Sequence, residues 1–126
     1  MTIEEIISYC LSKKGSYLDF PFGEVPICVK VYKRLFAQIY PRSEDRKITL
    51  NCDKITGTIY RNLYPDTVVR GYHCPPIQQP YFNTVHLNEQ VSDDDLRTMI
   101  DHSYTTVLGK LPKKVREALK GETDES

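Results

Sequence analysis

The side chains with catalytic potential in this sequence are three histidines, four cysteines and a few carboxylates. His73 adjoins Cys74, a base beside a nucleophile, but adjacent residues of an extended segment point to opposite faces. Asp101, His102 and Ser103 are the residue types of a hydrolytic triad. On a helix, however, consecutive residues are spread about 100° apart and cannot form a relay. We therefore predict no catalytic residue and no enzyme, and expect His102 or Ser103 to bond a neighbouring loop or a buried carbonyl.

Metal and cofactor sites are also not predicted. The cysteines have wide spacing, with no Cys-x-x-Cys pair and no paired histidines at zinc-finger distance. The aspartates at 93–95 fall at an expected helix start, where negative charge stabilises the helix dipole. No glycine-rich nucleotide loop is present. The N-terminal segment carries acids and no basic stretch ahead of an apolar run, so we expect a cytoplasmic protein with reduced, mostly buried thiols. These thiols are Cys10, Cys28, Cys52 and Cys74.

Charge is distributed unevenly along the chain. The 126 residues carry 17 basic and 17 acidic side chains, so the formal net charge is zero. Residues 30–86 nevertheless hold nine Lys or Arg and four acids, with tyrosines interleaved. Basic and aromatic side chains together suit phosphate contact and base stacking, although tyrosine is also ordinary strand composition. The candidate phosphate-contacting residues are Lys33, Arg34, Arg42, Arg46, Lys47 and Arg70, with Tyr81 to stack or pack beside them.

Hydrophobic periodicity predicts the elements that position these residues. Helical spacing predicts a first helix over 2–14, and Ile55, Ile59 and Leu63 predict a second after the N-cap Asp53. A long amphipathic helix begins at Ser92 and is expected to bury Leu96, Ile100 and Leu108 against the sheet, and a short basic helix follows Pro112. The strand-like runs are 27–32, 35–40, 47–52, 68–72 and 81–87, and the Pro- and aromatic-rich segment 16–26 is expected to be a loop.

The order of these elements predicts the fold class. It reads α-β3-α-β2-α(α), without the regular strand–helix alternation of doubly wound folds. We expect a two-layer α+β domain, with an antiparallel five-stranded sheet and its helices on one face. Residues 1–120 would form a single domain and residues 121–126 a disordered acidic tail. No apolar run approaches the roughly 20 residues of a membrane span.

Six short motifs in order resemble the MmcQ/YjbR family of small bacterial proteins, over about residues 1–120. They are DFPFG (19–23), LNCD (50–53), LYP (63–65), GYH (71–73), FNTVHLN (82–88) and IDHSY with LPKKVR (100–116). The resemblance implies a two-layer α+β fold related to CyaY-like folds, with the element order given above. It also implies DNA binding through a proposed double-wing motif, and no established catalytic residues.

One stretch departs from the family pattern. Relatives often read KKHWN before the last strand, whereas this chain has Gln79, Pro80, Tyr81, Phe82 and Asn83. Phe82 takes the tryptophan position and the lysines are absent, so this stretch would contact phosphate less than in relatives.

Two hypotheses of function follow. The first is a small cytoplasmic, non-enzymatic domain that binds DNA weakly and without sequence preference through the basic middle segment. Under it, reversing Arg34 and Arg46 should abolish binding, and reversing Lys113 and Lys114 should matter less. The alternative is a protein- or small-ligand-binding module with a groove lined by Phe20, Phe22, Tyr72 and His73.

Overall fold

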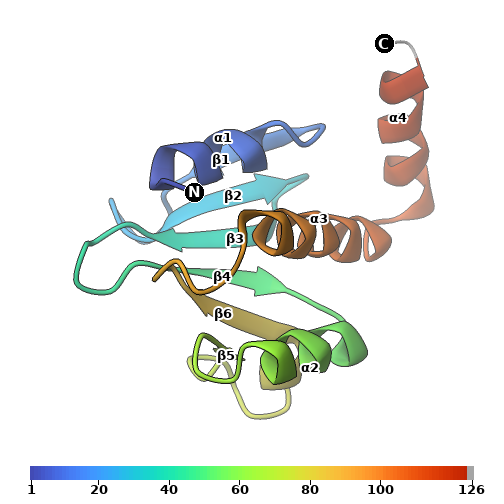
Figure 1. The fold of residues 1–126 in the computed structure, drawn as a ribbon. Coiled ribbons are helices and arrows are strands. Elements are labelled where there is room, and N and C mark those ends of the chain that lie inside the picture. Colours follow the sequence, from blue (N-terminus) through green and yellow to red (C-terminus); the bar gives the residue numbers. More distant parts are fainter. Residues whose placement is uncertain (125–126) are drawn as a thin grey trace.

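A six-stranded antiparallel sheet, in the order β1-β2-β3-β4-β6-β5, organises the chain (Figure 1). The computed structural model describes residues 1–124, with side chains through residue 118. Its elements are α1 (Ile3–Leu11), β1 (Ser16–Asp19), β2 (Ile27–Val31), β3 (Arg34–Tyr40), β4 (Lys47–Asn51), α2 (Lys54–Leu63), β5 (Val68–Arg70), η1 (Gln79–Tyr81), β6 (Phe82–His86), α3 (Asp93–Gly109) and α4 (Lys113–Asp124). The predicted α+β class with an antiparallel sheet is confirmed.

The strand count differs from the prediction by one. Residues 16–19, expected to be part of a loop, form the edge strand β1, which pairs with β2 from Ser16–Val31 to Asp19–Cys28. The prolines that argued for a loop, Pro21 and Pro26, lie beyond the strand and do not interrupt its hydrogen bonds.

The β2–β3 turn also differs. Tyr32 and Lys33, rather than Lys33 and Arg34, are the turn residues, because both have positive φ, 47° and 65°. Two left-handed residues suit the twist of a tight hairpin. Strand β3 therefore begins at Arg34. Further along it, Phe36 is the extra residue of a β-bulge opposite Val29 and Lys30.

The helix starts match the predicted caps better than the helix ends do. Thr2 and Glu5 form a capping box at α1, which ends at Leu11, before the predicted Lys14. Asp53 caps α2 through Thr56 N, at 2.7 Å. Ser92 caps α3 through the backbone of Asp95, whose carboxylate accepts instead from the Tyr64 hydroxyl.

Helix α2 does not pack through its isoleucine–leucine stripe. Ile55, Ile59 and Leu63 are 76%, 51% and 61% exposed. The buried face contains Gly57, where an added Cβ would lie 2.6 Å from Cys52 Sγ. The close packing of α2 against Cys52 therefore requires glycine at this position.

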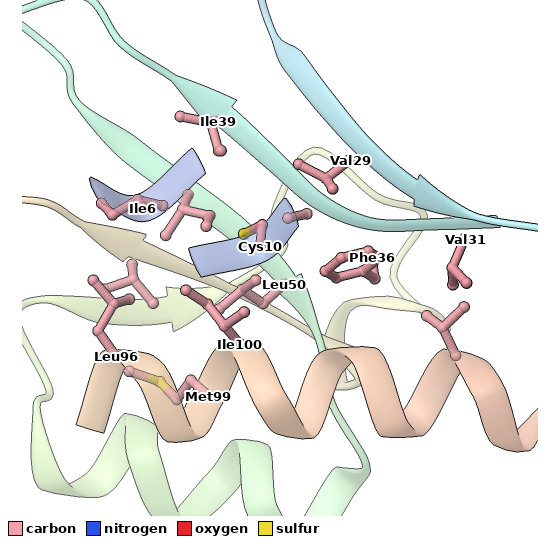
Figure 2. Close-up of a cluster of buried hydrophobic side chains, with 14 of the residues drawn as sticks. Ile6, Cys10, Val29, Val31, Phe36, Ile39, Leu50, Leu96, Met99 and Ile100 are labelled. Carbon is pink, nitrogen blue, oxygen red and sulfur yellow. The ribbon is translucent and has the colours of Figure 1, made fainter. Parts of the chain in front are cut away.

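The core lies between the sheet and helices α1 and α3 (Figure 2). Ile6 and Cys10 of α1 and Ile100 of α3 are completely buried among the strand side chains. Leu96 is buried as predicted, and Leu108 is partly buried against the same cluster. The other core residues labelled in Figure 2 are Val29, Val31, Phe36, Ile39, Leu50 and Met99.

Helix α4 projects from the end of α3, away from the sheet (Figure 1). It extends through Asp124, so most of the expected tail, residues 121–126, is described as helix, whereas 125–126 lie outside the described residues. Within residues 1–124, no helix is long and apolar enough to cross a membrane.

Candidate functional site

The sequence-predicted cations lie at two opposite ends of the sheet. We call the end with the β2–β3 turn, where β4 finishes at Asn51, the turn end. The opposite end, with the β3–β4 connection over 41–46, is the loop end. Strand β3 has seven residues and so separates the two ends by about 20 Å. Lys33, Arg34 and Arg70 lie at the turn end, whereas Arg42, Arg46 and Lys47 lie at the loop end.

The loop-end cations are poorly disposed for phosphate contact. Lys47 Nζ lies 2.7 Å from Asp45 Oδ2, and this ion pair lowers the pKa of the Asp45 carboxyl. The same ammonium lies 5.1 Å from the centre of the Tyr40 ring. Arg46 is half-buried, and only Arg42 is exposed. The loop end therefore offers one accessible cation from the predicted set.

The turn end gathers cations from separate parts of the chain. Lys33, Arg34 and Arg70 are exposed there, and none has an acidic partner within the described part of the chain. Exposed Lys54 follows directly after β4 and the N-cap Asp53. Residues 110–116 add Lys110, Lys113, Lys114 and Arg116. We call these eight residues the basic end.

Helix α3 brings residues 110–116 to the turn end. Its Ser103 Oγ donates to Phe36 O at 2.6 Å and accepts from Asn51 N at 2.8 Å, which holds the C-terminal half of the helix over β3 and β4. The Lys110 charge is near enough to favour the Cys52 thiolate, although burial outweighs it and raises the pKa of Cys52 to about 11. Ser103 thus bonds a buried carbonyl, as expected.

Acidic groups do little to neutralise the basic end. The Asp53 carboxylate caps α2, and the Thr56 backbone N–H holds its pKa below the ordinary value. It also lies 3.4 Å from His102 Nε2. Glu117 is 3.9 Å from Lys113. Both carboxylates stay charged, but two acids do not balance eight cations, so the basic end keeps a net positive charge.

Tyr81 lies beside the basic end. It is 45% exposed at the end of η1, and its carbonyl accepts from Cys52 N at 2.9 Å. Asn83 belongs to the same stretch, residues 79–83, which differs from the family pattern. Its side chain is buried and joins two elements, because it accepts a hydrogen bond from Arg61 Nη1 at 2.6 Å and donates one to Gly57 O. Tyr81 is therefore an exposed aromatic residue at the same end of the sheet as these cations.

The four residues of the predicted aromatic groove are not brought together. Phe20 and Phe22 follow β1 at the loop end, whereas Tyr72 and His73 follow β5 at the turn end. Strands β1 and β5 are opposite edges of the sheet (Figure 1). Each residue is exposed, with Phe22 at 69% and Tyr72 at 68%. The sequence could not show this separation, because the distance between the two segments depends on the order of the strands in the sheet.

The His73–Cys74 pair is arranged differently from the expectation. Their side chains are in contact, with Sγ 3.5 Å from Nε2, because residues 71–74 form a turn closed by Cys74 N and Gly71 O rather than an extended segment. Burial nevertheless raises the pKa of the Cys74 thiol, so the contact does not produce a reactive thiolate. All four cysteines are free, and burial raises the pKa of Cys10 to about 12.

Comparison with known proteins places this arrangement in a family. The model of the YjbR family matches residues 11–106. The chain belongs to the YjbR family. Its relative YjbR of Escherichia coli K12 is 24% identical over 119 residues, which is 94% of this chain and 98% of the relative. The resemblance inferred from the six motifs is thus confirmed.

Solved structures agree with the fold. A Deinococcus radiodurans protein with a DUF419 domain is 26% identical and has a TM-score of 0.83, over 94% of this chain and 88% of its own. A Pseudomonas syringae protein, 17% identical, has a TM-score of 0.62 over 82% of this chain and 96% of its own.

Proposed function

We propose that this YjbR-family domain binds double-stranded DNA, weakly and without sequence preference, through the basic end. The observation that supports the proposal is the collection of exposed cations from the β2–β3 turn, the end of β5, the start of α2 and residues 110–116 at one end of the sheet. Cations that face solvent can each neutralise a backbone phosphate and release its counterion, which is the main source of non-specific affinity.

The shape of the basic end suits backbone contact rather than base readout. Lys33 and Arg34 lie on a tight turn, and Lys113 and Lys114 on a projecting helix, so they can reach phosphates on different sides of a groove. Tyr81 supplies an exposed ring at the same end of the sheet. Four free thiols agree with a reducing compartment, so a cytoplasmic location belongs to the same proposal.

The structure changes which residues this proposal uses. The sequence grouped Arg46 with Arg34, but Arg46 is half-buried at the loop end, some 20 Å from the turn. Lys113 and Lys114, expected to matter less, are exposed residues of the basic end. We therefore assign Lys113 and Lys114 to the interface and remove Arg42, Arg46 and Lys47 from it.

Fluorescence anisotropy of a labelled duplex over a range of salt concentrations tests the proposal. With about four phosphates neutralised, log affinity should fall against log salt with a slope of about −3.6, and Kd should be on the order of 10⁻⁴–10⁻⁶ M at physiological salt. Arg34→Glu should weaken binding several-fold and reduce the slope by about one.

Arg42→Glu is the matched control. It makes the same change at an exposed arginine without an acidic partner among the described residues, but at the other end of the sheet. Binding should be unchanged in this variant and reduced in the double variant Lys113→Glu, Lys114→Glu. Equal losses for Arg34→Glu and Arg42→Glu would contradict the assignment to the basic end. The absence of binding at low salt would contradict DNA binding itself.

A further inference from the structure

A cavity at the loop end of the sheet is separate from the basic end. It has a volume of about 330 Å³ and lies between the start of α3 and the adjoining ends of β4 and β6. Arg46 lines it together with Leu87, Val91 and Leu96. Its volume is at the lower end of the range for small-molecule sites in proteins.

The guanidinium of Arg46 is the unusual group in this cavity. Its Nε is completely buried and has no hydrogen-bond partner among the described residues. The backbone is well held, since Arg46 O accepts from Leu87 N at 2.9 Å. Buried polar groups normally have partners, because an unpaired donor loses its hydration without compensation. This Nε is covered by protein atoms and is closed to a ligand, so an acceptor in the cavity would have to be held by the two Nη groups, which also have no partner among the described residues.

Nearby carboxylates do not serve as that acceptor. Asp45 is paired with Lys47 at 2.7 Å, and Asp93 lies 2.9 Å from the N-terminal ammonium. Glu89, also on the cavity wall, is exposed and forms no ion pair with Arg46. The guanidinium therefore has no ion-pair partner among the described residues, and its Nη donors remain available to a ligand.

The composition of the wall indicates the class of ligand. A guanidinium presents a planar pair of donors that matches a carboxylate, and Leu87, Val91 and Leu96 offer an apolar surface to an alkyl chain. Glu89 and Asp93 would repel a doubly charged phosphate more strongly than a singly charged carboxylate. We propose that this cavity binds a small monocarboxylate with a short alkyl chain, its carboxylate on Arg46.

Amide NMR spectra of the wild-type protein, titrated with sodium hexanoate at constant ionic strength, test the proposal. The expected result is saturable binding in the millimolar range, with shifts at the amides of Leu87, Val91 and Leu96. Acetate should bind more weakly, by up to about fourfold for each missing methylene group, because it does not reach the apolar wall. Inorganic phosphate should bind more weakly than hexanoate.

Variants separate the Arg46 contact from general charge. Arg46→Gln should weaken hexanoate binding by about tenfold or more, and the control Arg42→Gln, which removes an exposed arginine of the same connection, should leave it unchanged. Should Arg46→Gln not fold, Val91→Phe fills the cavity while leaving Arg46 in place, and it should weaken binding similarly. No saturable shifts for the wild type, equal affinity in these variants, or phosphate binding tighter than hexanoate would overturn the proposal.

Discussion

Ser103 provides the sharpest test of how α3 is held on the sheet. Its side chain is completely buried, and its hydroxyl donates to Phe36 O at 2.6 Å while accepting from Asn51 N at 2.8 Å. Both backbone groups belong to irregular places in the ladder. Phe36 is the extra residue of the bulge in β3, and Asn51 is the last residue of β4. One hydroxyl thus satisfies two groups that regular pairing leaves open.

Ser103→Ala should therefore be costly although it removes a single atom and leaves almost no cavity. A buried backbone group without a partner costs about 1–3 kcal/mol, and two are affected. Alanine recovers roughly 0.5 kcal/mol through its higher helix propensity, and the carbonyl, with two lone pairs, loses less than the N–H. We expect the free energy of unfolding to fall by about 2–4 kcal/mol.

Urea unfolding followed by circular dichroism measures this loss. The matched control is Ser8→Ala, the same change inside helix α1 at an exposed position, which should alter stability by less than about 0.5 kcal/mol. Should Ser103→Ala be no more destabilising than Ser8→Ala, the hydroxyl would not be what joins α3 to the bulge.

Three further expectations concern the core, the thiols and a helix cap. Ile100→Ala should lower stability by about 2–5 kcal/mol in thermal or urea unfolding, since Ile100 is completely buried, and a nearly unchanged melt would contradict the packing of α3. In timed iodoacetamide labelling, Cys74 should react well before Cys10 and Cys52, whose pKa values are about 12 and about 11, and equal rates would contradict their burial. The lowered pKa of Asp53 means that its carboxylate stabilises the fold above the ordinary aspartate range and that this stabilisation is lost as pH falls through the lowered value. Asp53→Ala should thus cost about 1 kcal/mol at neutral pH and little at the acid limit, and an equal loss at both would exclude the capping role.

The sequence predicted correctly those features that depend on residues close together in the chain, such as helix caps and the apolar stripe of a helix. The caps at Asp53 and Ser92 act over three residues, and both are present. The stripe of α3 is read by spacing alone, and Leu96 and Ile100 are buried as expected. Strand β1 was missed because it has only four residues, none of them buried, and so resembles a loop until a partner strand is known.

The facing of α2 was hidden for a different reason. The spacing of Ile55, Ile59 and Leu63 predicts a helix correctly, but these side chains are exposed. The buried face of α2 is instead the one that lies closest to the segment after β4. Gly57 lies on that face, beside Cys52 Sγ. From the sequence alone, a glycine inside a helix indicates only a lower helix propensity, whereas in this fold its missing side chain allows the close contact.

The candidate site could be predicted in its residue types but not in its grouping. Six of the nine cations of the middle segment were selected, without Lys54, and two of the six, Arg34 and Arg46, lie at opposite ends of one strand pair although they are twelve residues apart. Conversely, Lys110 and Lys113 are distant in sequence from Arg34 and lie at its end of the sheet, because Ser103 holds the end of α3 there. Which cations share one surface depends on the strand register and on how the helices pack on the sheet, and no short motif contains this information.

The same geometry makes the two proposed sites independent of each other. The length of β3 separates Arg34 from the Arg46 cavity by about 20 Å, whereas charges in physiological salt are screened over about 8 Å. Arg46→Gln should therefore leave the salt slope of DNA binding unchanged, and Lys113→Glu with Lys114→Glu should leave hexanoate affinity unchanged. Coupling between them would require a rearrangement of α3, the element that contributes Leu96 to the cavity and leads to Lys110 at the basic end.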